Sequence, residues 1–377
     1  MPAEVIDRRD ALEPVFEPWR RLATTRGSAF LTPEWYLTAL DVVHDDGVPA
    51  VAVARNGNGA VEGLLPLVWT DTAGRHGTAE VPATRFADVF QLVCEESNED
   101  AVAAAVAPAL AQHLGRRCQL RLGRLDPAGG WWGELARAWP ASLTAVTGPE
   151  EALPYVMLDG TSWEEYLASR TGQFRSQVRR KMRSLQRDHE VRVRRTATAE
   201  EVAGDIKTLF ELHERRWAGR DQASSLADAR LRAFHRRFAV AAQENGWLRL
   251  YLLEVDGVPV AAWYGWRVGE RYAYYQAGFD PAWARHSVGF LLMAETIREA
   301  IAEGAAEYDL LLGDEPFKLR FATAQHRARW TVLAPPLSRT RIAQAAANAA
   351  RAGVRALPEA AQRSLRRLRG RLRGPGP

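Results

Sequence analysis

Residues 285–290 read Arg-His-Ser-Val-Gly-Phe, and they join a predicted strand to a predicted helix. Apolar residues that recur every three or four positions between 290 and 302 predict the helix. Ser287 is a natural N-cap, and Gly304 is a natural stop. The first turn of a helix has backbone N–H groups without helical partners, and Arg285 adds a cation beside them. The stretch therefore favours a site for an anion, such as a phosphate chain, at the start of this helix.

Two interpretations of this loop stay open. Gly289 has no Cβ, so a ligand could approach the backbone closely. Alternatively, Ser287 only caps the helix and Gly289 only turns the chain, because one glycine and one arginine form a weak motif.

The surrounding pattern predicts an α+β fold. Residues 250–268 read as a hairpin with Asp256-Gly257 at its turn. A third strand is predicted at 272–277 and a fourth at 308–312, after the helix. This order predicts a mixed, largely antiparallel sheet flanked by helices.

The first half of the chain repeats this pattern. Residues 51–69 match the hairpin, 89–92 match 274–277, and a helix at 101–114 and a strand at 119–122 follow. Chance recurrence of two glycine-turn hairpins is the alternative. In the first copy the acidic run at 95–100 precedes the helix and would repel a phosphate chain. We therefore expect the second copy to be the catalytic one.

At 377 residues the chain has room for two or three domains. The region between Pro127 and Pro154, rich in Gly, Pro and Trp, predicts a boundary. We expect an N-terminal domain at 1–150, a catalytic domain at 151–336 and an Arg-rich tail, helical or disordered, at 337–377. The tail has ten arginines opposed only by Glu359, so its net charge is +9. Such a tail either contacts a membrane surface, nucleic acid or an acidic protein, or serves as a solubilising end.

Composition excludes several classes. No apolar stretch has membrane-spanning length, and Met1–Asp10 lacks the apolar region of a signal peptide, so we expect a cytoplasmic protein. Cys94 and Cys118 are the two cysteines of the sequence, which suggests neither a disulfide framework nor a zinc site.

A predicted helix at 162–187 is strongly basic. One face carries an apolar stripe, and arginines and a lysine cover the rest. The basic residues are either a solvated face or a landing site for an acidic helix of a carrier protein, the nucleotide end of CoA, or tRNA phosphates.

The second half resembles the GNAT acyltransferase superfamily, and more narrowly the branch with the cellulose-biosynthesis-type acetyltransferase domain and the Fem-type aminoacyl transferases. The likeness covers about 153–331. Its carriers are Tyr166 with Phe174 to Leu185, His213 to Trp217, Tyr275 to Asp280, Ser287 to Leu292, and Tyr308 to Lys318.

The resemblance implies two tandem GNAT-like domains and an acyl donor that is acyl-CoA or phosphopantetheine-linked, with no metal. The residues expected to hold this donor are Gln276, Ala277, Gly278, Arg285, Ser287, Val288, Gly289 and Phe290. His213, Arg216 and Trp217 correspond to the acceptor side of the Fem-like families, although a lone helical histidine is more often structural.

Acyl transfer to an amine needs a base, a stabilised oxyanion and an acid for the leaving thiolate. Asp309, Asp314 and Glu315 are candidate bases, and Tyr274 or Tyr275 is a candidate acid. The pair Phe317-Lys318 corresponds to an aromatic-lysine pair of the Fem-like proteins, so Lys318 is expected to stabilise developing negative charge. A surface lysine after a proline turn is the alternative.

These observations predict an N-acyltransferase that moves an acyl group from acyl-CoA or acyl carrier protein to a primary amine of a small molecule or peptide by direct attack. One alternative is a Fem-like ligase that uses aminoacyl-tRNA and acts on a cell-wall precursor or peptide. Another is a non-catalytic scaffold in polysaccharide biosynthesis. Fold alone does not choose among them.

Overall fold

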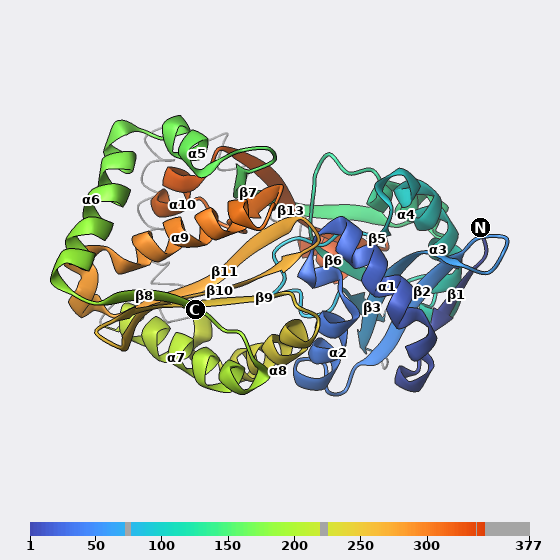
Figure 1. Cartoon of the computed structure of the whole chain (residues 1–377). Coiled ribbons are helices and arrows are strands. Elements are labelled where there is room, and N and C mark those ends of the chain that lie inside the picture. The colour runs from blue at the N-terminus through green and yellow to red at the C-terminus, as the bar shows by residue number, and fades with distance from the viewer. Residues whose placement is uncertain (72–76, 219–224, 337, 344–377) are drawn as a thin grey trace, which may run out of the picture.

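A computed structural model describes residues 1–71, 77–218, 225–336 and 338–343 (Figure 1). The strands are β1 Ala3–Ile6, β2 Val48–Arg55, β3 Val61–Asp71, β4 Thr78–Glu80, β5 Val93–Cys94, β6 Gln119–Leu125, β7 Thr144–Met157, β8 Val191–Arg195, β9 Leu248–Val255, β10 Val258–Val268, β11 Arg271–Phe279, β12 Glu307–Asp309 and β13 Ala324–Ala334. The α-helices are α1 Glu13–Arg26, α2 Pro33–Val42, α3 Glu99–Leu114, α4 Trp131–Ala138, α5 Trp163–Ser169, α6 Gly172–Asp188, α7 Ala199–Trp217, α8 Ala229–Glu244, α9 Val288–Ala302 and α10 Pro316–Phe321. Of the predicted Arg-rich tail, residues 337 and 344–377 lie outside the described residues.

The two halves repeat one strand arrangement within a continuous sheet. Its order is β1-β2-β3-β4-β6-β13-β7-β12-β11-β10-β9-β8, and β5 pairs with β3 beside this path. In the first half, β2, β3 and β4 are antiparallel and β4 is parallel to β6. In the second half, β9, β10 and β11 are antiparallel and β11 is parallel to β12. The predicted tandem fold is confirmed.

The halves exchange a strand. β7 follows the first half in sequence but pairs with β12, and β13 follows the second half but pairs with β6. β7 and β13 also pair with each other, from Ala324 opposite Tyr155 to Ala334 opposite Thr144. This antiparallel pair joins the halves in Figure 1. The sequence boundary expected at 150/151 therefore lies inside β7.

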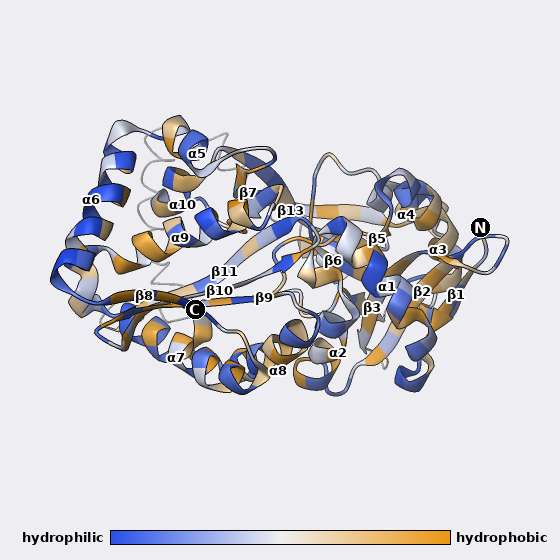
Figure 2. Cartoon of the chain, in the orientation of Figure 1, coloured by the Kyte–Doolittle hydropathy of each residue, from blue (hydrophilic) through white to orange (hydrophobic). Residues whose placement is uncertain are grey.

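The second half buries a core on each face of its sheet. In Figure 2, hydrophobic and hydrophilic segments alternate along the helices that cover these faces. Side chains of a strand alternate between faces, so Ala273 joins the core under α7 and α8, while Tyr272 and Tyr274 join the core under α6 and α9. Trp35 of α2 enters the first of these cores and packs edge-on against Phe234 and Phe238 of α8. The first half thereby helps to close the core of the second.

Several predicted elements differ from the structure. Residues 89–92 are not a strand, and β4 takes the position equivalent to β11. Pro82 follows β4 and lacks an N–H donor, and Ala83 has φ +50°, so the chain leaves the sheet there. The strand predicted at 308–312 ends at Asp309, and Leu311 has φ +57°.

The helix predicted at 162–187 is two helices, α5 and α6. Arg170 and Thr171 are extended between them, and the Thr171 side chain caps α6. Ser162 and Glu165 form a capping box at the start of α5. The helices predicted at 101–114 and 290–302 are confirmed as α3 and α9.

Within the described ranges, no helix combines the length and the apolar character needed to cross a membrane.

Candidate active site

A gap opens in the sheet between β11 and the chain that follows β12. β12 pairs with β11 only from Arg271 to Ala273, whereas β11 continues to Phe279. The register of β10 and β11 slips between Tyr264 and Gly265, so Tyr275 bulges from the ladder. Backbone groups on this edge of β11, beyond Ala273, therefore face the gap instead of a neighbouring strand.

A cavity of about 290 Å³ lies at this gap, against the start of α9. Aromatic and aliphatic side chains supply most of its wall, and two arginines supply its charge. The lining residues are Arg216, Tyr274, Ala277, Phe279, Ala284, Ser287, Val288, Gly289, Phe290, Met293, Phe317, Arg320 and Phe321. Five of the eight residues expected to hold the donor are among them: Ala277, Ser287, Val288, Gly289 and Phe290.

The start of α9 leaves three backbone donors unused. The Leu291 N–H donates to Ser287 O, but in the described chain no acceptor pairs with the N–H groups of Val288, Gly289 and Phe290. Ser287 is the N-cap residue, yet it is left-handed at φ +58° and its side chain makes no cap hydrogen bond, so the predicted side-chain cap is wrong. A ligand acceptor would satisfy these donors.

Gly289 keeps this surface open. A Cβ at this position would lie 3.1 Å from Cδ1 of Phe279, which also lines the cavity. A larger side chain would therefore fill the space between α9 and β11.

Arg285 does not line the cavity. Its guanidinium Nε donates to His286 Nε2 over 2.9 Å, and its backbone carbonyl accepts from Lys181 of α6. Arg320 takes the place expected for Arg285, since it lines the cavity with its guanidinium 4.8 Å from the centre of the Phe290 ring. The sequence analysis missed Arg320 because α10 reads only as a short turn after Pro316.

Arg216 is the predicted acceptor-side residue that reaches the cavity. It donates to Ala277 O over 3.1 Å, and its guanidinium lies 5.3 Å from the Phe279 ring centre and 5.9 Å from that of Phe317. It thus fixes a positive charge between β11 and α10.

His213 and Gln276 lie outside the cavity. His213 is buried, and burial together with Arg216 lowers its pKa to about 4, so the imidazole is neutral at pH 7. The Gln276 side chain is a hydrogen-bond partner of this ring. A Cβ on Gly278 would meet His213 N at 2.3 Å, so Gly278 allows β11 to approach α7. These residues connect the helix and strand, and Trp217 stacks near His213 at 6.0 Å without lining the cavity.

Tyr274 and Tyr275 face opposite sides of β11. Tyr274 is buried and lines the cavity, and burial raises the pKa of its hydroxyl while Arg216 opposes the shift. Tyr275 packs at 4.6 Å from His235 on the other face and donates to Phe86 O over 3.1 Å. Tyr274 and not Tyr275 is therefore the tyrosine positioned at the cavity, because adjacent side chains of a strand face opposite sides of the sheet.

Lys318 follows Phe317, which lines the cavity at the gap. Its ammonium is buried, donates to Leu312 O and lies 3.2 Å from Glu315 Oε2. Glu315 is exposed and Asp314 is exposed. Lys318 itself is not among the residues that line the cavity.

Asp88 of the first half also reaches this region, and no sequence signal pointed to it. Its Oδ2 accepts from Leu312 N over 3.1 Å. Burial raises the pKa of this carboxyl, and the Leu312 N–H and Lys318 oppose the shift. Only the packing of the two halves brings Asp88 beside Lys318.

Asp309 lines a second cavity, of about 300 Å³, between the halves. Its carboxylate accepts from Leu311 N over 2.7 Å, and burial raises its pKa to about 7. Arg26, Glu96 and His326 share this polar cavity. Asp309 therefore lies apart from the cavity that holds Tyr274.

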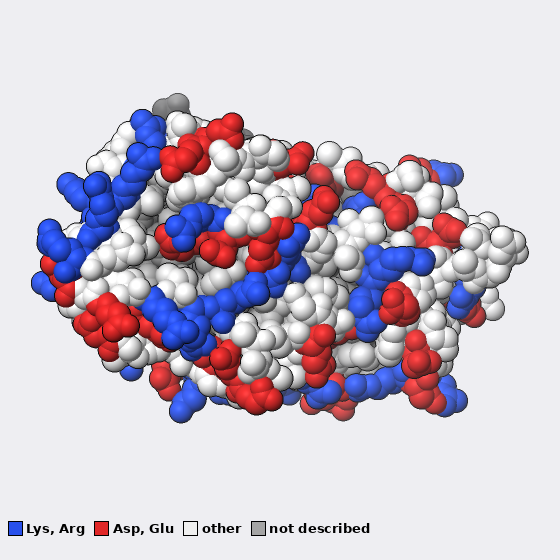
Figure 3. Space-filling model, viewed as in Figure 1, with Lys and Arg blue, Asp and Glu red and all other residues white. Residues whose placement is uncertain are grey.

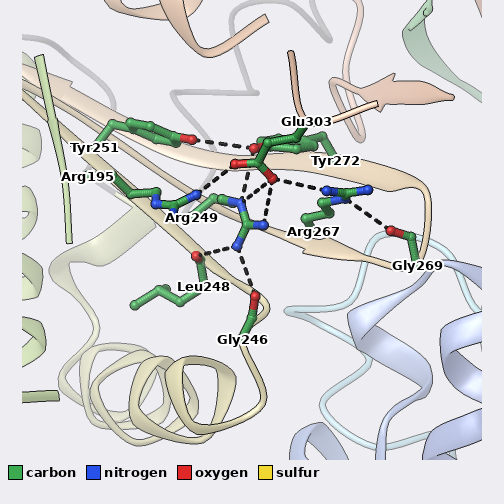
Figure 4. Close-up of polar contacts among 9 residues, drawn as sticks. All are labelled: Arg195, Gly246, Leu248, Arg249, Tyr251, Arg267, Gly269, Tyr272 and Glu303. Carbon is green, nitrogen blue, oxygen red and sulfur yellow. Dashed lines mark hydrogen bonds and ion pairs between the residues drawn. The ribbon is translucent and has the colours of Figure 1, made fainter. Parts of the chain in front are cut away.

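The far end of α9 is anchored by a charged network (Figure 4). Glu303 follows the last residue of α9 and accepts from Arg249, Arg195 and Arg267, the first at 2.7 Å. A carboxylate is unfavourable at the negative end of a helix. Burial alone would raise its pKa, but the hydrogen bonds from Arg249 and Tyr272 outweigh burial and lower the pKa of Glu303. The network holds α9 on the sheet, which fixes its start at the cavity.

In the described ranges, no group of three or more His, Cys, Asp or Glu side chains forms a set that could hold a metal ion.

Comparison with known proteins agrees with this geometry. Residues 172–319 match the family model of the acetyltransferase (GNAT) domain. No curated protein matches the chain. The crystal structure of FemX has 12% identity and a TM-score of 0.63, covering 88% of this chain and 97% of its own.

Two further structures share the fold. The C-terminal domain of a putative lysylphosphatidylglycerol synthetase from Agrobacterium fabrum has 13% identity and a TM-score of 0.53, covering 90% of this chain and 96% of its own. L-PGS from Bacillus licheniformis has 10% identity and a TM-score of 0.51, covering 90% and 96%. These likenesses concern the fold, whereas the family match runs from α6 into α10 and includes most of the residues that line the cavity. Through that match, residues 172–319 are identified as a GNAT acetyltransferase domain.

Proposed function

We propose that the protein transfers an acyl group from a phosphopantetheine thioester to a primary amine. One observation carries the proposal. The cavity extends from three unpaired N–H groups at the start of α9 to the open edge of β11. A phosphate at α9 and a thioester at β11 would fit its two ends, and the apolar wall between them suits the pantetheine arm.

The reaction follows from the groups around the gap. The free amine attacks the thioester carbonyl, so a C–N bond forms and the C–S bond breaks. The proton of the attacking nitrogen passes to the Asp88 carboxylate by way of solvent, because Asp88 does not itself line the cavity, and the leaving thiolate takes a proton from the Tyr274 hydroxyl. Both groups return to their starting states by exchange with water. Backbone N–H groups on the open edge of β11 stabilise the oxyanion, and Arg216 in the cavity wall stabilises negative charge.

Asp88 suits the role of base because its raised pKa makes the carboxylate a better proton acceptor. Tyr274 suits the role of acid because burial raises its pKa and keeps the hydroxyl protonated at neutral pH. Glu315 stays close enough to raise the pKa of Tyr274 further, although it is exposed.

The test is thiol release from acetyl-CoA, octanoyl-CoA and the matching S-acyl pantetheines, with a panel of primary amines. Intact-mass analysis identifies the amide formed. We expect amine-dependent thiol release by the native chain and its loss in Gly289→Leu. The absence of both amine-dependent release and a thermal shift with any thioester would refute the proposal.

A second candidate donor is aminoacyl-tRNA. The FemX fold over 88% of this chain and the cations of α6 favour it. The same amine panel would be tested with aminoacyl-tRNA as the donor. Aminoacyl transfer that ribonuclease abolishes and salt weakens would identify aminoacyl-tRNA as the donor in place of the thioester.

A further inference from the structure

Six cations of α6, four of them exposed and two half-buried at its flanks, form a surface that we call the α6 basic face. Its residues are Arg175, Arg179, Arg180, Lys181, Arg183 and Arg187. Figure 3 shows Lys and Arg gathered over this helix at the left edge of the molecule.

Little of this charge is neutralised. Among the described residues, Arg179 pairs with Glu164 and Arg187 pairs with Asp188. Arg175 donates to the carbonyls of Ala168 and Arg170 instead, and Arg183 donates to the carbonyl of Arg179. Four cations thus have no carboxylate partner among the residues that the structure describes: Arg175, Arg180, Lys181 and Arg183.

The α6 basic face borders the donor cavity. Lys181 donates to Arg285 O, two residues before the free N–H groups of α9. Phe174 packs at 5.2 Å from Phe290 in the cavity wall, and Gln177 accepts from Arg320, which lines the cavity. A partner bound to α6 would therefore hold its ligand at the cavity mouth.

An exposed apolar residue is adjacent in sequence to Arg320, whose guanidinium donates to Gln177 of α6. Leu319, next to Arg320, is 42% exposed. Cations flanking an exposed apolar residue suit a protein helix that presents acidic and apolar residues together, whereas RNA phosphates would use only the cations.

The length of this row of cations favours a protein partner over the nucleotide of CoA. Twelve residues separate Arg175 from Arg187, which corresponds to about 18 Å along a helix. The phosphates of one nucleotide cluster at one place and would engage only part of this row.

We propose that the α6 basic face docks an acidic carrier protein whose phosphopantetheine arm enters the cavity. This inference rests on the proposed function, since the arm would deliver the thioester used there. The complex would be electrostatically steered and sensitive to salt.

The test compares two donors with one acyl group, octanoyl-loaded acyl carrier protein and octanoyl-pantetheine. The charge-reversal variant is Arg180→Glu/Arg183→Glu, at two exposed residues. The control Arg21→Glu/Lys207→Glu removes the same charge at exposed positions on α1 and α7. We expect the α6 variant to lose about tenfold or more in kcat/KM with the carrier and less than twofold with the pantetheine, while the control stays within twofold for both.

A direct binding measurement tests the docking of the carrier even if the protein shows no turnover. Fluorescence anisotropy would follow labelled octanoyl-carrier binding to the native chain, the α6 variant and the control. Carrier binding that the α6 variant weakens supports docking even where the proposed catalysis fails. Equal losses with both donors, undiminished use of the carrier, or binding of tRNA in place of the carrier would overturn the inference.

Discussion

The starts of α3 and α9 occupy equivalent places in the two halves, but their chemistry is opposite. The first turn of α3 carries Glu99 and Asp100, and Glu99 is paired with Arg26 at 2.7 Å. Cys94 and Val102 pack so closely on Gly63 that an added Cβ there would meet both at 2.8 Å. The first turn of α9 has no acid and opens onto the 290 Å³ cavity.

The difference shows how a repeated fold specialises. Hairpins and a parallel crossover recur because apolar spacing specifies them, whereas the first helical turn decides what the site can bind. The first half keeps a second role, because Asp88 accepts from Leu312 N near the gap and Phe86 O accepts from Tyr275 on the other face of β11.

The largest effect is expected from a substitution at the second position of α9, and the second position of α3 supplies the control. Gly289→Leu should lower kcat/KM with a thioester donor by about 100-fold, or ~2.7 kcal/mol, because the side chain fills the cavity. Asp100→Leu, at the same position of α3, should change kcat/KM with the thioester donor by less than twofold. Equal losses in the two variants would end the distinction between the helices.

Asp88→Asn tests whether the first half takes part in chemistry. We expect kcat to fall by about 30-fold, because the amide cannot accept the proton. In the native chain, kcat/KM should fall as pH drops through the raised pKa of Asp88, and this acid limb should be missing from the variant. An unchanged acid limb in Asp88→Asn would assign the base to another group.

Tyr274→Phe and Tyr275→Phe separate the faces of β11. Tyr274→Phe should lower kcat about tenfold with little change in stability. Tyr275→Phe should leave kcat unchanged but lower the free energy of unfolding by about 1 kcal/mol, because it removes the bond to Phe86 O. Urea unfolding and steady-state kinetics would check both, and the reverse pattern would restore Tyr275 as the acid.

The smallest effect concerns Asp309 in the cavity between the halves. Its pKa is raised to about 7 in the folded state, so the stability it contributes is present below its ordinary pKa and is lost as pH rises through 7. Asp309→Asn should therefore be more stable than the native chain at pH 8, by about 1–3 kcal/mol, and about equal at pH 4. Thermal unfolding of the native chain and of Asp309→Asn at these two pH values would measure the difference in stability. The same pH dependence of stability in both chains would refute the prediction.

The sequence alone predicted much of the second half. The spacing of Leu291, Ala294 and Ile297 predicted α9, the Asp256-Gly257 turn predicted the β9–β10 hairpin, and Gly304, at φ +73°, ends α9 as expected. These signals are local, since helix period, turn chemistry and end residues act within a few positions.

The sequence predicted only part of the candidate site. Val288, Gly289 and Phe290 line the cavity as expected, whereas Tyr275 and Asp309 face elsewhere. Tyr275 faces the side of β11 opposite to Tyr274, as strand alternation requires, and no local pattern tells which face of a strand will line a cavity.

By itself the sequence determined the repeated fold, the helix whose start faces the cavity, and the basic face of α6, because each depends on the spacing of neighbouring residues. Only the tertiary structure decided that Tyr274, Arg216 and Arg320 share one cavity and that Asp88 lies beside Lys318. These residues come from different helices, strands and halves, and the exchange of β7 and β13 brings the two halves together.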